Sequence, residues 1–206
     1  MIKENRSFWK KQVIYGVIVL MLLGAGCYYY FSSSPITITP YDEKRDTKQL
    51  LDIFKQDWYW LILGGDYNRE SALYFLNVNT PKNRAKQLKI FVMRQGRVCI
   101  GFVALFMISP ELGRLQFLAI DKKFRRHTYG AQLFYYGVQQ LLAMGAKKVE
   151  LLVRKNNIPA QKLYKKFGFY EIVGYTEPEG GIYFEYDPLK ASLPMSLTSQ
   201  AEPVVA

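Results

Sequence analysis

The chain is poor in the residues that hold metal ions or form disulfides. Its 206 residues include two cysteines and a single histidine. Cys27 lies in an apolar run and Cys99 in a strand-like run, with no C-x-x-C spacing, so the pattern argues against a disulfide framework and against zinc. We expect Cys99 to be a small buried apolar residue, and we expect no metal site around His127.

Acidic residues are also scarce. The chain has 17 Asp and Glu against 28 Lys and Arg, a formal net charge of +11. Such an excess favours anionic partners such as nucleotides, phosphates, acidic lipids or nucleic acid, or it only keeps the surface soluble. The lysines are scattered among helical segments without an aromatic stacking platform, so we expect no nucleic-acid binding.

The N-terminal part is rich in apolar residues. No residue from Gln12 to Tyr41 carries a charge, and residues 13–31 are strongly apolar throughout. A bilayer core needs about 20 helical residues, and three tyrosines at positions 28–30 suit the membrane interface. We therefore predict a basic segment over 1–11, a transmembrane helix over 12–31, a linker over 32–35 and a single-pass membrane protein.

Two alternatives to an uncleaved anchor stay open at this point. A cleaved signal peptide has the same charged start and apolar centre, and Gly-Ala-Gly before Cys27 resembles a lipoprotein cleavage site, although Gly24 stands where leucine is usual. Lysines and arginines before the span weakly favour a cytosolic N-terminus. That orientation would place the domain outside the cytosol, and the side on which the domain lies is left open.

Hydrophobic periodicity and turn residues predict the rest of the chain as one α/β domain over 36–187, followed by a loose tail over 188–206. Mixed hairpins and helical crossovers predict a mixed sheet flanked by helices. The expected order is strand 36–39, helices 46–63 and 70–76, strands 89–93, 98–108 and 114–120, helix 129–144, strand 149–153, helix 159–167, and strands 169–175 and 182–186.

Two segments carry candidate chemistry. In residues 118–131, an apolar strand runs into a basic turn and then into a helix start. Amides at a helix N-terminus cradle phosphate, although a solvated basic turn would look the same. The second segment reads N-x-x-A-x-x-L-Y-x-x-x-G-F from Asn157 to Phe169.

The two segments, one helix and one strand apart, resemble the acetyl-CoA-binding motifs of the GNAT N-acetyltransferase superfamily. The resemblance spans about residues 36–186. It implies a splayed central sheet, with a bulged strand over 115–120 parting from the strand over 149–153. It also implies an enzyme that moves an acetyl group from acetyl-CoA to a small-molecule, peptide or protein amine by direct attack on the thioester.

The resemblance also implies site residues. Pantetheine would pair with backbone groups near Leu118, Ala119 and Ile120, and Tyr164 would be catalytic, giving a proton to the leaving thiolate. The pyrophosphate would lie on the turn that opens the following helix, and the helix after the next strand would contact the cofactor arm. These further cofactor residues would be Arg125, Arg126, His127, Thr128, Tyr129, Gly130, Ala131, Asn157 and Ala160.

The chain departs from the family pattern in two ways. Thr128 replaces the first glycine of the pyrophosphate turn, and threonine would be strained there if the position required positive φ. The central strand has no acid to serve as general base; Glu111 is the nearest carboxylate on its N-terminal side, and a water chain could serve instead. Both departures motivate the alternative of a catalytically inactive, membrane-bound binding or scaffold module. The acceptor cannot be read from the sequence.

Overall fold

A computed structural model describes residues 34–76, 88–176 and 180–190. The chain divides into two compact units, Met1–Ile36 and Thr37–Ala206, and the account below concerns the second. No helix within the described ranges has the length and apolar character needed to cross a membrane. The predicted anchor over 12–31 and most of the predicted tail lie outside the described residues.

The described strands form a seven-stranded sheet in the order β1-β2-β3-β4-β5-β7-β6. β4 and β5 are parallel, whereas β2 with β3, β3 with β4, β5 with β7 and β6 with β7 are antiparallel. The mixed sheet is as predicted, and the element order matches the predicted one. The strands are β1 (Ile36–Pro40), β2 (Lys89–Gln95), β3 (Val98–Met107), β4 (Leu112–Ile120), β5 (Lys148–Arg154), β6 (Tyr170–Thr176) and β7 (Gly181–Tyr186).

Helices cover both faces of the sheet, each over its own apolar core. The helices are α2 (Glu43–Leu61), α3 (Arg69–Leu76), α4 (Tyr129–Ala143) and α5 (Ile158–Lys166). One core packs α4 and α5 against the sheet around Phe134, Phe167 and Phe184. The other packs α2 and α3 around Phe54 and Phe102. Because these strands are buried on both faces, β3 and residues 90–93 of β2 are apolar without a break.

Helix α2 begins three residues before the predicted start at Asp46. Asp42 is the N-cap, and its carboxylate accepts from the Arg45 N–H at 2.8 Å. Asp46 reaches back to accept from the Asp42 N–H at 2.9 Å. The two side chains thus satisfy backbone donors reciprocally. This start signal begins at Asp42, ahead of the first apolar residue of the helix, so the apolar periodicity alone placed the start too late.

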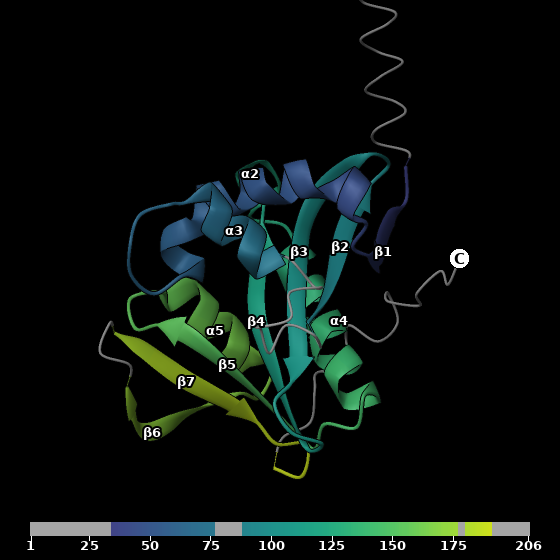
Figure 1. Cartoon of the computed structure of the whole chain (residues 1–206). Coiled ribbons are helices and arrows are strands. Elements are labelled where there is room, and N and C mark those ends of the chain that lie inside the picture. The colour runs from purple at the N-terminus through teal and green to yellow at the C-terminus, as the bar shows by residue number, and fades with distance from the viewer. Residues whose placement is uncertain (1–33, 77–87, 177–179, 191–206) are drawn as a thin grey trace, which may run out of the picture. The chain divides into compact units, whose positions relative to one another are not determined.

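The sheet parts between β4 and β5. The parallel pairing runs only from Leu112 opposite Lys148 to Leu115 opposite Leu151, and beyond that point β5 turns away from β4 toward its carboxyl end (Figure 1). A bulge lies at the same level, because Ala104 pairs with Phe117 while Leu105 pairs with Leu115, which leaves Gln116 as the extra residue of β4. The predicted splay and the predicted bulge are both present.

Candidate active site

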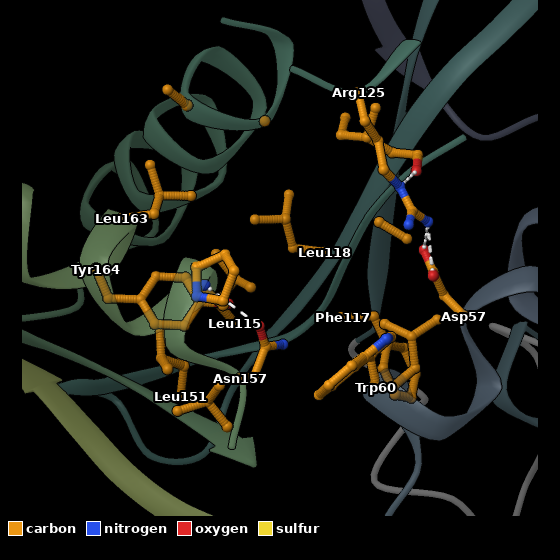
Figure 2. A pocket seen from close by; sticks show the side chains of 18 of the residues that line it. Asp57, Trp60, Leu115, Phe117, Leu118, Arg125, Leu151, Asn157, Leu163 and Tyr164 are labelled. Carbon is orange, nitrogen blue, oxygen red and sulfur yellow. Dashed lines mark hydrogen bonds and ion pairs between the residues drawn. The ribbon is translucent and has the colours of Figure 1, made fainter. Parts of the chain in front are cut away.

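The space between the parted strands is a cavity of about 570 Å³. Its walls are the diverging ends of β4 and β5, the turn and helix start that follow β4, one side of α5, and the end of α2. Figure 2 shows Tyr164 and Leu163 on one side of this cavity and Asp57, Trp60 and Arg125 on the other. The predicted site residues that line it are Leu118, Ala119, Ile120, Arg125, Arg126, His127, Gly130, Ala131, Asn157, Ala160 and Tyr164.

One edge of the cavity is a strand edge with free backbone groups. The Asp121 N–H donates to the Ile100 carbonyl at 2.9 Å, and the register pairs Ile120 with Gly101 and Leu118 with Val103. Hydrogen-bonded and non-bonded pairs alternate along an antiparallel ladder. Leu118 and Ile120 are therefore non-bonded positions toward β3, and their N–H and C=O groups face the cavity. The Ile120 carbonyl accepts from Arg125 Nε, whereas the other three groups have no partner among the described residues and are open to an extended ligand arm.

The turn after β4 supplies a second set of free donors. Within the described chain, none of the backbone N–H groups from Arg125 to Ala131 donates to a backbone or side-chain acceptor, and the first α-helical bond runs from the Gln132 N–H to the Thr128 carbonyl at 2.9 Å. Successive free amides at the start of a 15-residue helix form a concave site for an anion, and the helix dipole adds to it.

Thr128 is not strained in this turn. It is the N-cap of α4 with φ −74° and ψ −2°, which is ordinary backbone for a threonine. The residue with positive φ is Arg126, at 65°. The replacement of glycine at position 128 therefore costs no backbone strain, and Thr128 and Tyr129 fall outside the residues that line the cavity.

Tyr164 approaches the cavity from α5. Its ring packs against Phe134 at a centroid distance of 5.0 Å and against Phe184 at 6.2 Å, while its ring end points into the cavity (Figure 2). Burial raises the pKa of the phenol well above its usual value, so the hydroxyl stays protonated at neutral pH. Among the described residues the hydroxyl has no hydrogen-bond partner, which leaves its proton free for a ligand atom.

Asn157 holds the start of α5. Its side-chain oxygen accepts from the Ala160 N–H at 3.3 Å, and Pro159 follows in the first turn, a regular arrangement for a helix start. This cap fixes the turn between β5 and α5, and with it the position of Tyr164 two turns later.

Arg125 is engaged by the protein itself. Its Nη2 lies 2.6 Å and 2.5 Å from the two carboxylate oxygens of Asp57, and its Nε donates to the Ile120 carbonyl at 2.9 Å. Burial raises the pKa of Asp57, although the hydrogen bond and the charge of Arg125 oppose that rise. Asp57 and Leu61 also line the cavity, and neither could be predicted from the sequence, because nothing in the α2 pattern shows which turn faces β4.

Glu111 lies away from the cavity. Its carboxylate pairs with Lys147 on the surface and is not among the lining residues. Glu150 of β5 is closer to the point where the strands part, next to the last paired position, and its carboxylate accepts from Arg114 Nε at 2.6 Å. The described residues contain no group of three or more His, Cys, Asp or Glu side chains that could hold a metal ion.

The sequence profile of the Acetyltransferase (GNAT) family matches residues 47–169. The chain belongs to this family. GNAT acetyltransferases use acetyl-CoA as co-substrate. The free edge of β4, the amides of residues 125–131 and the cavity between β4 and β5, called the slot below, fit such a ligand.

Two relatives show how far the likeness reaches. The domain is 31% identical over 84 residues to mycothiol acetyltransferase of Corynebacterium glutamicum, which is 41% of this chain and 29% of that one. It is 32% identical over 68 residues to a putative ribosomal protein bS18 alanine N-acetyltransferase of Bacillus subtilis, covering 33% of this chain and 44% of the relative. The chain thus spans under half the length of either relative.

A solved GNAT structure shares the fold. The PaiA N-acetyltransferase of Thermoplasma acidophilum, in complex with coenzyme A, superposes with a TM-score of 0.56 at 16% identity, over 74% of this chain and 99% of that one.

Proposed function

We propose that this GNAT domain transfers an acetyl group from acetyl-CoA to an amine. The observation that carries the proposal is the slot that opens where β4 and β5 stop pairing after Leu115 and Leu151. It lies between the backbone amides of residues 125–131 and the Tyr164 hydroxyl, none of which has a hydrogen-bond partner within the described ranges. The pantetheine arm would extend β4 through Leu118 and Ile120, and the pyrophosphate would accept from the amides of residues 125–131.

The chemistry follows from this placement. The amine nitrogen attacks the thioester carbonyl, the negative charge moves to the carbonyl oxygen, and a backbone N–H at the bulge of β4 stabilises that oxyanion. The carbon–sulfur bond then breaks, the sulfur leaves as a thiolate, and the extra proton of the attacking nitrogen passes to water, which leaves a neutral amide. Tyr164 donates a hydrogen bond to the sulfur. Because burial makes the phenol a weaker acid than an ordinary tyrosine, donating a hydrogen bond suits it better than complete proton transfer to a thiol of pKa about 8.5.

The acceptor is defined only as an amine. The two relatives are named for mycothiol and for the alanine of a ribosomal protein, so small molecules and peptides both belong in the test. Isothermal titration of the full-length chain with acetyl-CoA, followed by mass spectrometry of a panel of amines, peptides and polyamines, tests the proposal. We expect saturable binding and the gain of one acetyl group on some acceptor. Absence of binding at millimolar acetyl-CoA would refute it and favour a scaffold role.

We also propose that residues 12–31 anchor the protein in a membrane. The support is the charge-free apolar run in the sequence. Fractionation of cells that express the full-length chain tests this. Recovery in the membrane pellet after an alkaline carbonate wash is the expected result, and recovery of intact chain in the supernatant would contradict it.

A further inference from the structure

The pairing of β4 with β5 ends at Leu115 and Leu151, so strand hydrogen bonds do not fix the distance between the two strands beyond that point. A cavity that binds an extended arm nevertheless needs a fixed width. The last turn and a half of α2 lies beside this opening, since Asp57, Trp60 and Leu61 line the cavity. This part of α2 makes polar contacts with the segments that follow both parted strands.

On the β4 side, the contact is the Asp57–Arg125 pair already described. The Arg125 guanidinium also bonds the last carbonyl of β4, that of Ile120, so it joins the strand end directly to α2. Gln56 adds to the same side, because its amide donates to Asp121 at 3.2 Å and accepts from the Lys122 N–H at 3.1 Å.

On the β5 side, the contact is made by Arg154, the last residue of β5. Its Nε donates to the Tyr59 carbonyl and its Nη2 donates to the Ile62 carbonyl at 2.8 Å. The guanidinium lies over the Tyr59 ring, 4.1 Å from the centroid. Asn156 donates to the Tyr59 hydroxyl at 2.9 Å. The last turn of α2 carries no basic residue of its own, so Arg154 supplies the positive charge that a helix C-terminus favours.

We propose that the end of α2 is a spacer that sets the width of the slot, and that Arg125 and Arg154 are the positioning residues that fix it to β4 and β5. Arg125 then acts on the pantetheine arm through the geometry of the slot, and its side chain is not a phosphate ligand. This inference rests on the proposed binding of coenzyme A in the slot.

The two roles of Arg125 predict different ligand dependence. Coenzyme A contains the arm and three phosphates, whereas adenosine 3′-phosphate 5′-diphosphate (3′-phospho-ADP) contains the same three phosphates without the arm. A phosphate ligand affects the affinity for both. A residue that sets the slot width affects coenzyme A alone, because only the arm enters the slot.

The experiment compares the affinities of coenzyme A and 3′-phospho-ADP for full-length variants by isothermal titration. We expect Arg125→Gln, Asp57→Asn and Arg154→Gln each to weaken coenzyme A binding roughly 2- to 30-fold while the affinity for 3′-phospho-ADP stays within twofold. The double variant Arg125→Gln with Asp57→Asn should lose no more affinity for coenzyme A than either single variant, because both substitutions remove the same contact. Arg97→Gln is the control for the loss of one positive charge. Arg97 lies in the exposed turn between β2 and β3, so this variant should change neither affinity.

Equal losses for both ligands in Arg125→Gln, with no loss in Asp57→Asn, would overturn the inference and assign Arg125 to the phosphates. Unchanged coenzyme A affinity in all three variants would also overturn it. If a variant fails to fold, Arg125→Lys and Arg154→Lys, which keep the charge and lose the planar fork, give the same comparison. Failure of the wild-type chain to bind either ligand would instead count against the proposed function.

Discussion

Replacing Tyr164 by phenylalanine removes one hydroxyl from the slot and leaves the rest of the ring. The ring is 8% exposed and packs on Phe134 and Phe184. Phenylalanine keeps all of those contacts, and within the described residues the hydroxyl bonds to nothing. We therefore expect thermal unfolding of Tyr164→Phe to match the wild type closely, and the effect to fall on catalysis.

The size of that effect follows from the charge on the leaving sulfur. A hydrogen bond to a charged group contributes about 1.5–3 kcal/mol. Since about 1.36 kcal/mol corresponds to a tenfold change in rate, the loss in kcat should be roughly 10- to 150-fold, with the Kd for acetyl-CoA nearly unchanged. The assay is steady-state release of free coenzyme A with the best acceptor from the screen.

A pH profile adds a second readout. Because the pKa of the Tyr164 phenol is raised above its usual value of about 10, the wild type should show no loss of kcat from Tyr164 titration below pH 10. Tyr136→Phe is the matched control, since Tyr136 packs on Phe91 outside the slot. A kcat for Tyr164→Phe within twofold of the wild type would refute the role assigned to the hydroxyl.

Three further predictions concern the scaffold around the slot. Asp46→Asn should destabilise the fold by about 3–5 kcal/mol, because it removes one partner of a buried ion pair with Arg94, 2.5 Å apart; urea unfolding measures this. Burial raises the pKa of Asp46, but hydrogen bonds from Arg45 and the Asp42 amide and the charge of Arg94 outweigh it and lower the pKa overall. The stabilisation is therefore present above about pH 4 and is lost as pH falls through the lowered folded-state pKa, so unfolding of Asp46→Asn should depend less on acid than that of the wild type. Thr128→Gly should leave acetyl-CoA affinity unchanged in titrations, because φ at this residue is already −74°; a clear gain in affinity would show that the threonine obstructs the turn. Gly101→Ala should cost about 1–3 kcal/mol in thermal unfolding, because a Cβ there would lie 2.4 Å from the Ala119 carbonyl oxygen of β4, and an unchanged midpoint would contradict that.

Much of the fold could be predicted from the sequence because its signals are local. Gly96 and Gly168 mark a tight turn and a helix end, and both have positive φ in the structure. Asn157 lies just ahead of the helix predicted over 159–167, a usual place for a capping residue, and it caps α5 in the structure. The bulge and the splay came from the family resemblance, since neither has a local sequence signal here.

The parts that could not be predicted depend on contacts between distant segments. Arg125 lies in the motif expected to hold phosphate, but its side chain bonds Asp57, 68 residues earlier in the chain. Arg154 likewise bonds the end of α2 more than 90 residues away. No local pattern indicates such partners, because they depend on how α2 lies across the ends of β4 and β5.

Amide hydrogen exchange tests the account most directly, with the protein free, bound to coenzyme A and bound to 3′-phospho-ADP. If the arm extends β4 in the slot, coenzyme A should slow exchange at the Leu118 and Ile120 amides and in the turn over 125–131. The nucleotide without the arm should slow exchange in the turn alone. Coenzyme A binding that leaves the Leu118 and Ile120 amides exchanging at their free rate would contradict the account.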